Sequence, residues 1–325
     1  MFTYDQLLSK LKKELQTLPL SGDPKGLYEP INYELSLGGK RLRPVLCLMA
    51  YNLYSEEVAT AMNAALGIEV FHNFTLLHDD IMDKADMRRG KPTVHNIWNN
   101  NTAILSGDAM QILAYQLMCQ SPIEYLKPLL DTFSKTAMEV CEGQQLDMDY
   151  ETRDKVTAEE YLNMIRLKTA VLIAASLKIG AILGGASEKD ADKLYSFGQN
   201  IGLAFQLKDD LLDVYGNPAV FGKNIGGDIT SNKKTYLMIS ALERANGSQL
   251  TQLERWIAKE EPTRAEEKIA AVTEIYNQIG VKDLCEEKMK EYYRNALSDL
   301  EKISVEQSKK ELLREVAASL MDRDV

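Results

Sequence analysis

The sequence predicts an all-α protein with a single domain over residues 1–325. Apolar residues recur at three- and four-residue spacing along most of the chain, and no stretch alternates apolar and polar residues as a half-buried strand does. Glycine and proline gather in a few loops, and neither a linker nor a repeat divides the chain. With 45% hydrophobic and 26% charged residues, the composition is that of a globular protein with ample length to bury a core.

The predicted helices begin near the N-terminus and continue to Met321. In the first two thirds of the chain they are Tyr4–Leu18, Pro44–Tyr54, Glu56–Lys84, Thr102–Met118, Glu124–Glu142, Ala158–Leu183 and Glu188–Tyr215. In the last third, the apolar period is the same while more charge lies on the outer face of each helix. The helices expected there are Gln249–Glu261, Arg264–Gly280, Val281–Leu300 and Val305–Met321.

Charge and hydropathy exclude several classes of partner. A formal net charge of −10 disfavours binding to nucleic acid or to an anionic membrane surface. The longest apolar stretch, Thr169 to Leu177, is much shorter than the ~18 residues that a membrane span requires. Residues 1–6 lack the features of a secretory signal, so we expect a cytoplasmic protein. The cysteines show no C-x-x-C spacing and are interpreted as reduced thiols of the core: Cys47, Cys119, Cys141 and Cys285.

Two aspartate clusters of the form Asp-Asp-x-x-Asp are the strongest functional signal. They lie at residues 79–83 and 209–213, and apolar residues fill the gaps and the upstream flanks of both. On a helix, the first and last aspartates of each cluster share a face about 6 Å apart. Carboxylates that close repel one another and are costly to bury without a cation. The pattern therefore predicts a cavity with Mg²⁺ on two walls and a polyanion bridged between them.

A loop with two glycines and three cations precedes the first cluster. Lys40, Arg41 and Arg43 stand beside Gly38 and Gly39, directly before a predicted helix. Backbone and side-chain donors of such a loop can approach a phosphate together. The alternative is a basic helix start that only solvates itself, and the helix macrodipole disfavours it.

Each aspartate cluster is also followed by a cationic loop. The sequence Arg88-Arg89-Gly90-Lys91 comes after the first cluster, and its cations are either salt-bridge partners of the carboxylates or phosphate ligands. The glycine-rich segment Phe221–Asp228, with Lys233-Lys234-Thr235 behind it, comes after the second cluster. We expect this segment to fold over a bound anion as a lid.

These features and three further motifs follow one another in a fixed order. They are Gly38-Gly39-Lys40-x-x-Arg43-Pro44, the first aspartate cluster with Arg88-Arg89-Gly90, Gly107-Asp108, Gly143-Gln144-x-x-Asp147, Lys168-Thr169, and Gln206 with the second cluster. The ordered set resembles the trans-isoprenyl diphosphate synthases of the polyprenyl synthetase family, from about residue 38 to about residue 235. The resemblance implies a single helical bundle of the isoprenoid synthase type with a central active-site cavity, assembled as a homodimer.

The resemblance also implies roles for individual residues. The diphosphate of isopentenyl diphosphate would be held by Lys40, Arg43, His72 and Arg89. Three Mg²⁺ ions with the allylic diphosphate would be bound by Asp79, Asp83 and Asp209, while metal-bound waters or cationic neighbours would be oriented by Asp80, Asp210 and Asp213. The allylic diphosphate would be neutralised by Arg88, Lys168, Lys223 and Lys233. Polar groups near the reacting carbons would come from Thr169, Gln144 and Gln206.

Spacing supports the role of His72 independently. It lies seven residues before Asp79, two helical turns away and on nearly the same face. By itself a buried histidine is more often a structural residue, and the motifs around His72 favour the functional interpretation. His78 and His95 have no such context and are expected to be structural.

The implied reaction joins isopentenyl diphosphate to dimethylallyl, geranyl or farnesyl diphosphate through an allylic cation. Two other classes of protein remain open. A class I terpene cyclase is also helical with one Asp-Asp-x-x-Asp, but its second metal motif is usually of another type, and it has no use for the loop at Gly38–Arg43. A regulatory subunit of a heteromeric synthase typically lacks aspartates that this chain retains.

Product length is predicted from residues upstream of the first cluster. Thr75, Phe74 and Phe71 lie about 6, 7.5 and 12 Å along the helix from Asp79, within one arc. Two aromatic rings there would close a short tunnel, and in the family such a pattern accompanies C15 or C20 products. The small residue at Thr75 favours geranylgeranyl over farnesyl diphosphate. The alternative is that Phe71 and Phe74 belong only to the core.

Overall fold

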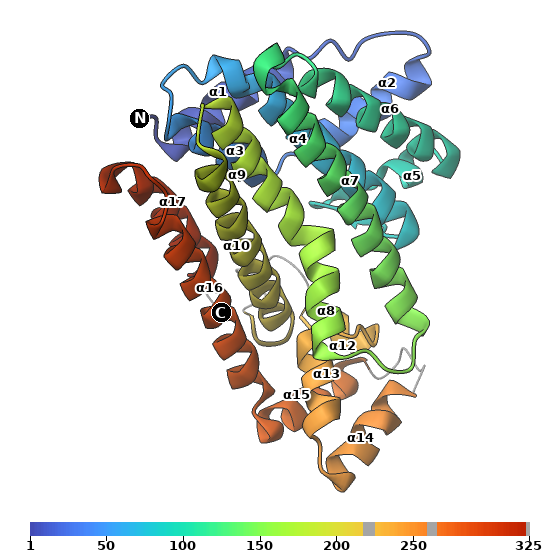
Figure 1. The fold of residues 1–325 in the computed structure, drawn as a ribbon. Coiled ribbons are helices and arrows are strands. Elements are labelled where there is room, and N and C mark those ends of the chain that lie inside the picture. Colours follow the sequence, from blue (N-terminus) through green and yellow to red (C-terminus); the bar gives the residue numbers. More distant parts are fainter. Residues whose placement is uncertain (217–224, 259–264, 323–325) are drawn as a thin grey trace. The chain divides into compact units, whose positions relative to one another are not determined.

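The computed structural model describes residues 1–216, 225–258 and 265–322. Helices dominate these residues, which confirms the predicted all-α fold (Figure 1). The chain divides into two compact units. Unit 1 comprises Met1–Lys135, Ala175–Tyr195 and Ile303–Leu312, and unit 2 comprises Thr136–Ala174, Ser196–Lys302 and Leu313–Val325. The single domain expected from the sequence stays a prediction.

Unit 1 is built around helix α4. Its helices are α1 (Tyr4–Gln16), α2 (Lys25–Ser36), α3 (Leu42–Asn52), α4 (Ala59–Met82), α5 (Val94–Ile97), α6 (Asn100–Met118) and the first part of α7 (Ile123–Thr152). Helix α4 is apolar on nearly every face and packs against α3 and α6 (Figure 1). Gly67 makes the α4–α6 approach close, because a Cβ there would lie 3.0 Å from the Ala114 carbonyl oxygen. The burial of α4 fixes the helix that ends in the first aspartate cluster.

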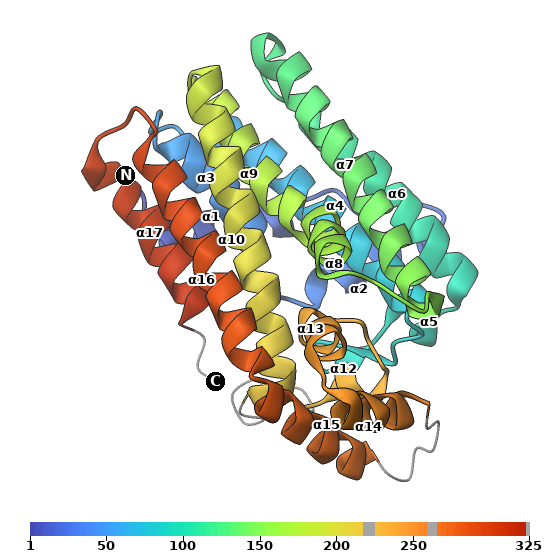
Figure 2. The same ribbon diagram turned by 60° about the horizontal axis from the view of Figure 1, so that its bottom comes forward.

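Unit 2 holds the second aspartate cluster. Its elements are the rest of α7, α8 (Ala158–Ile165), η1 (Arg166–Ala170), the start of α9 (Val171–Leu183), α10 (Glu188–Tyr215) from Ser196, α12 (Gly227–Thr230), α13 (Tyr236–Arg244), α14 (Gly247–Ile257), α15 (Ala265–Ile279), α16 (Val281–Glu301) and the end of α17 (Gln307–Met321). Helix α16 runs beside α10 (Figure 2), and the Ser196 hydroxyl donates to Asp299 Oδ2 at 2.5 Å. The hydrophobic core of unit 2 includes Tyr161, Leu207 and Tyr276.

A π-helical turn interrupts the helix predicted over Ala158–Leu183. The turn is η1, and it carries Lys168 and Thr169. Two glycines let neighbouring helices pack closely on it: a Cβ at Gly143 would lie 2.2 Å from the Lys168 backbone nitrogen, and one at Gly202 would lie 2.6 Å from the Ala170 Cα. Such turns are frequent at functional sites.

Most predicted helices are confirmed within a few residues, and α10 has the predicted bounds. Helix α7 continues past the predicted end at Glu142 to Thr152, because Gly143 serves close packing and does not end the helix. Helices α2, α5, α12 and α13 were not predicted, nor were strands β1 (Met87–Arg88) and β2 (Lys91–Pro92). Pro30 inside α2 and the brevity of the other elements hide them from a search for periodicity.

The cysteines differ from the prediction in one respect. All four are free thiols, and Cys47 and Cys285 are buried as expected. The prediction of a core position is wrong for Cys119 and Cys141, which are exposed. Cys119 is the C-cap of α6, and Cys141 lies on the outer face of α7. Among the described residues, no helix is long and apolar enough to cross a membrane.

Candidate active site

The first aspartate cluster lies at the C-terminal end of α4. Asp83 is the C-cap and is exposed, Asp79 is partly exposed, and Asp80 points inward with 1% of its surface exposed. Arg88 donates to Asp80 Oδ1 from Nε at 2.9 Å and from Nη2 at 2.5 Å, and its Nη2 lies 3.5 Å from Asp79 Oδ2. Of the two alternatives for the Arg88 guanidinium, the structure therefore shows the salt bridge to the cluster.

A β-hairpin holds Arg88 in that position. Strands β1 and β2 pair antiparallel with Arg88 opposite Lys91. The two residues of the turn, Arg89 and Gly90, have φ of 53° and 75°, as the tight turns that join hairpin strands require. Arg89 Nη1 donates to the Gly38 carbonyl oxygen, so the hairpin is fastened to the glycine loop. The two-residue strands are too short for alternation to reveal them in the sequence.

The three cations of the glycine loop do not act alike. Arg41 has φ of 51°, is buried, pairs with Glu69, and donates to the Leu35 carbonyl oxygen at 2.6 Å. It therefore stabilises unit 1 from the inside, and the phosphate-binding interpretation does not apply to it. Lys40 is exposed, and Arg43 is partly exposed with Nη1 3.2 Å from Nε2 of His72.

His72 is surrounded by positive charge. Burial, and then Arg43, Arg89, Arg41 and Arg88, lower the pKa of the His72 imidazole well below its usual value. The imidazole is therefore neutral near pH 7, and its Nε2 accepts the hydrogen bond from the Arg43 guanidinium. The remaining ring proton is then on Nδ1, which can donate to an anion.

His78 contacts backbone, as expected of a structural histidine. Its Nε2 lies 3.2 Å from the Ile104 carbonyl oxygen, so this nitrogen carries the proton. A Cβ at Gly107 would come 2.3 Å from Nε2, and the ring therefore needs the glycine opposite.

Glu34, a buried acid of α2 beside the first cluster, was not predicted from the sequence. Neither of its carboxylate oxygens has a hydrogen-bond partner among the described residues. Burial, and then the Asp80 carboxylate, raise the Glu34 pKa to about 7 against the opposing effects of Arg89, Arg88 and Arg41. In the sequence, Glu34 is one of several polar residues of an amphipathic helix, and no motif marks it as functional.

The second aspartate cluster lies near the end of α10. Asp209 and Asp213 are partly exposed, and Asp210 is buried at 3% exposure. The Tyr161 hydroxyl donates to Asp210 Oδ2 at 2.5 Å, and Gln206 Nε2 lies 3.4 Å from Asp210 Oδ1. Burial and then the Asp228 carboxylate raise the pKa of Asp210 to about 8. The middle aspartate of this cluster is thus held by neutral donors.

Two predicted site residues meet beside this cluster. Thr169 Oγ1 donates to Gln206 Oε1 at 3.3 Å, and the Gln206 amide in turn donates to Asp210. A chain of hydrogen bonds therefore runs from Tyr161 through Asp210 and Gln206 to Thr169. Gln144 lies on α7 with a buried Nε2 that has no partner among the described residues.

Asp213 fixes the backbone that follows the second cluster. Its Oδ2 accepts from the Asp228 amide at 3.0 Å, and its carbonyl oxygen accepts from the Gly226 amide at 2.6 Å. Lys223 and the first half of the predicted lid, residues 221–224, lie outside the described residues.

Two of the predicted phosphate-binding lysines share one carboxylate oxygen. Lys168 Nζ lies 2.6 Å and Lys233 Nζ 3.9 Å from Asp147 Oδ2. Asp147 belongs to the Gly-Gln-x-x-Asp motif, and the sequence search gave it no role of its own. Its position one helical turn after Gly143 is the feature of the sequence that could have indicated a role for Asp147.

The residues predicted to set product length form a packed aromatic pair. Phe71 is fully buried and Phe74 is 7% exposed, with ring centroids 5.4 Å apart. The Thr75 hydroxyl donates to the His72 carbonyl oxygen at 2.7 Å, which leaves its methyl group as the remaining surface of the side chain.

The donor set suits Mg²⁺, because carboxylate oxygens are the ligands that this hard cation prefers. One oxygen of Asp80 is buried and has no hydrogen-bond partner in the described structure. Within the described ranges, no group of three or more His, Cys, Asp or Glu side chains is close enough to hold a metal ion. A cation at either cluster would therefore need further oxygens from a substrate or from water.

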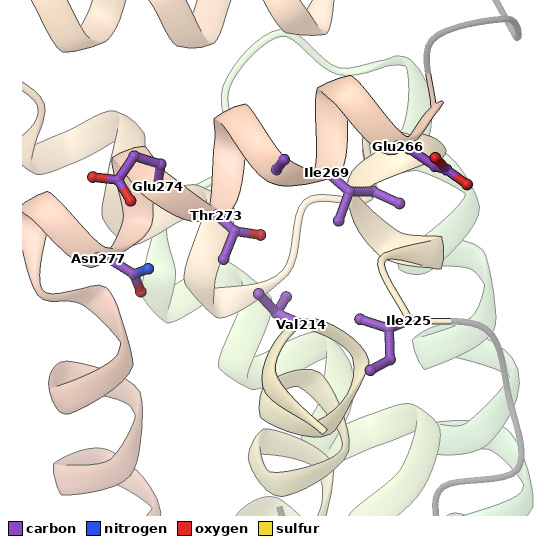
Figure 3. Close-up of a pocket in the computed structure, with 8 residues that line it drawn as sticks. Val214, Ile225, Glu266, Ile269, Thr273, Glu274 and Asn277 are labelled. Atoms are coloured by element: carbon purple, nitrogen blue, oxygen red, sulfur yellow. The ribbon is translucent and has the colours of Figure 1, made fainter. Parts of the chain in front are cut away.

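A separate pocket of about 390 Å³ lies in unit 2. Figure 3 shows Val214 of α10 and Ile225 opposite Ile269 and Thr273 of α15. None of the predicted site residues that the structure describes lines this pocket.

Comparison with known proteins gives a consistent result. The profile of the polyprenyl synthetase family matches residues 24–278. A geranylgeranyl diphosphate synthase of Methanosarcina mazei is 46% identical over 224 residues, 68% of this chain and 69% of that one. A geranylfarnesyl diphosphate synthase of Natronomonas pharaonis is 37% identical over 318 residues, 92% of this chain and 91% of that one. A crystal structure of a geranylgeranyl pyrophosphate synthase matches with a TM-score of 0.95 at 46% identity, over 100% of both chains.

Proposed function

Because the chain belongs to the polyprenyl synthetase family, we propose that it condenses isopentenyl diphosphate with an allylic diphosphate to give an all-trans C15–C20 product. Geranylgeranyl diphosphate is favoured over farnesyl diphosphate. The chain is a transferase of a Mg²⁺-dependent family. The observation that carries the proposal is that both aspartate clusters keep paired carboxylates at least partly exposed, while a side-chain donor holds the buried middle aspartate.

In this proposal isopentenyl diphosphate is held by unit 1. Lys40, Arg43 and Arg89 neutralise its diphosphate, and the neutral His72 donates from Nδ1. Because Arg89 is fastened to the Gly38 carbonyl and Arg43 to His72, these donors are ordered before the substrate arrives. Ordered donors lose little entropy when they bind an anion.

The allylic diphosphate is held through the aspartates and the remaining cations. We assign Asp79, Asp83 and Asp209 as ligands of three Mg²⁺ ions, which supply charge neutralisation of the leaving group. The other three aspartates fix the conformation of the clusters by accepting hydrogen bonds. Asp80 accepts from Arg88, Asp210 from the Tyr161 hydroxyl, and Asp213 from the Asp228 amide. Further positive charge comes from Arg88, Lys168, Lys223 and Lys233.

The reaction proceeds without a protein nucleophile. The allylic C–O bond breaks, and its electron pair leaves with the diphosphate. The double bond of isopentenyl diphosphate then attacks the allylic cation, and a proton is lost to the departing diphosphate. Thr169, Gln206 and Gln144 present polar atoms near the reacting carbons, and Lys168 stands beside Thr169 on the same π-turn. Preorganised polar groups of this kind stabilise developing charge more than water does.

Assembly and location belong to the same proposal. We propose a homodimer, and the support is an apolar stripe on α6, where Ile104, Leu105 and Ile112 are 42%, 60% and 61% exposed. A cytoplasmic location is supported by the four free thiols.

The test is an assay of the purified protein with Mg²⁺, isopentenyl diphosphate and each of dimethylallyl, geranyl and farnesyl diphosphate. We expect a C15–C20 prenyl diphosphate, and we expect Asp79→Ala and Asp209→Ala each to lower turnover by orders of magnitude. Product without isopentenyl diphosphate would identify a cyclase instead. A protein that needs a second polypeptide for turnover would be a regulatory subunit.

A further inference from the structure

Five aromatic rings form a continuous row inside unit 1. In order they are His78, Phe74, Phe71, Phe133 and Tyr115, and successive ring centroids lie 4.8, 5.4, 5.2 and 4.9 Å apart. The first three are on α4, Phe133 is on α7 and Tyr115 is on α6. The row therefore starts one residue before the first aspartate cluster and leads from α4 to two neighbouring helices.

Within the row, Phe74 lies nearer to the first aspartate cluster than Phe71 does. Phe74 and Phe71 lie about 7.5 and 12 Å along α4 from Asp79, so they are met in that order by a chain growing away from the cluster. Phe71 and Phe133 are both fully buried and meet at an interplanar angle of 73°. Edge-to-face contacts of this kind are favourable and orient both rings.

Phe133 is fully buried and packs against two rings, those of Phe71 and Tyr115. The ring of Tyr115 also packs against the Phe133 ring, at an interplanar angle of 67°, and the Tyr115 hydroxyl is 3.2 Å from Oγ of Ser134, the residue after Phe133. Because protein interiors are close-packed, a ring packed against two others transmits its support to the next ring.

We propose that Phe133 is a specificity-determining residue that limits product length by holding Phe71 in place. The inference rests on the proposed prenyl transfer and extends it to a residue that touches neither aspartate cluster. When the Phe133 ring is removed, the Phe71 ring gains a void into which it can turn. The floor below Phe74 then recedes, and the enzyme accepts at least one further C5 unit before elongation stops.

The experiment compares product lengths of the full-length enzyme and its variants with farnesyl diphosphate, isopentenyl diphosphate and Mg²⁺, by mass spectrometry. In Phe133→Ala, the fraction of product longer than the wild-type main product is expected to rise several-fold, less than in Phe74→Ala. Phe133→Leu, a milder change, is expected to shift the products in the same direction by less, which keeps the test available if the alanine variant does not fold.

Phe197→Ala is the matched control. Phe197 is also a buried phenylalanine, at 2% exposure, but it lies on α10 in unit 2 and outside the aromatic row. It is expected to lower the melting temperature about as much as Phe133→Ala while product length stays that of the wild type. Wild-type product lengths in active Phe133→Ala and Phe133→Leu, or an equal lengthening in Phe197→Ala, would overturn the role of Phe133. A wild-type protein that forms no prenyl product from dimethylallyl, geranyl or farnesyl diphosphate would instead overturn the proposed function.

Discussion

The two aspartate clusters have the same sequence pattern, yet their middle carboxylates are held in different ways. In unit 1, Asp80 pairs with the guanidinium of Arg88, whereas in unit 2, Asp210 accepts from the neutral donors of Tyr161 and Gln206. Burial raises the pKa of both carboxyls, but an adjacent cation opposes the rise at Asp80, and the Asp210 pKa reaches about 8. The shared motif thus buries the middle aspartate in both clusters. The protonation of that aspartate depends on the neighbouring residues, which differ between the two units.

The cationic side chains near the two clusters also differ in type and in how they are held. In unit 1 the predicted diphosphate-binding cations are arginines except for Lys40, and Arg41 pairs with Glu69 while Arg89 donates to the Gly38 carbonyl oxygen. In unit 2, Lys168 is paired with an aspartate outside the cluster. An arginine fork fixes direction, while a lysine is a point charge on a flexible stem. Unit 1 is therefore expected to be the more sensitive to loss of a single cation.

Arg88→Ala is expected to have the largest effect. It leaves the Asp80 carboxylate buried without its cation, so the free energy of unfolding should fall by about 3 kcal/mol. Arg89→Ala is the control, since it removes one hydrogen bond of an exposed residue and should cost about 1 kcal/mol. Urea unfolding in a chelating buffer measures both. Equal losses in the two variants would contradict the special role of the Arg88–Asp80 pair.

Glu34→Gln tests the charge balance beside Asp80 through pH. The Glu34 pKa is about 7 in the folded protein and near 4.5 in the unfolded chain, so folding favours the protonated acid. Stability is full below about pH 4.5 and is lost as pH rises towards 7, by up to about 3 kcal/mol at about 1.4 kcal/mol per pKa unit. Glutamine has no proton to lose, and this part of the pH dependence should vanish.

The measurement for Glu34 is urea unfolding of wild type and variant at about pH 5 and about pH 8, without divalent cations. The variant should gain stability relative to wild type between the two pH values. A parallel pH dependence of the two proteins would show that Glu34 is ionised in the folded state.

Tyr161→Phe is expected to have a smaller effect than either change in unit 1. It keeps the ring in the core and removes only the hydroxyl that donates to Asp210. Loss of one such bond costs roughly 1–2 kcal/mol. Because Asp210 also orients Gln206, we expect kcat to fall while the KM values for both substrates stay near wild type. An unchanged kcat would separate Tyr161 from the reaction.

The sequence predicted most of the helices because their apolar residues recur at helical spacing, while the roles of the site residues stay predictions. Both clusters lie on helices as expected, and in the first cluster Asp79 and Asp83 are at least partly exposed while Asp80 is buried. Those outcomes follow from helical geometry alone.

What the sequence did not predict depends on packing and on unusual backbone. Arg41 turns inward because it adopts a left-handed conformation that is uncommon outside glycine. The π-turn at Arg166–Ala170 adds a residue to one turn inside a segment whose apolar spacing predicts one continuous helix. Tyr161 resembles any aromatic core residue until its hydroxyl is seen to meet Asp210. Partner choice among buried polar groups is a property of three-dimensional proximity, which no local pattern encodes.

Asp147→Asn is expected to have the smallest effect and to refine the contrast between the units. The Asp147 carboxylate holds Lys168 at 2.6 Å, and a diphosphate must compete with it for the lysine. Removing the charge while keeping the shape should lower the KM for the allylic diphosphate about threefold, the scale of a partly exposed ion pair. Asp149→Asn is the control, because Asp149 is exposed on the same helix and its carboxylate accepts from Gln145 at 2.7 Å. If the KM of Asp147→Asn rises instead, Asp147 presents Lys168 to the substrate and does not restrain it, and the lysines of unit 2 are then as preordered as the arginines of unit 1.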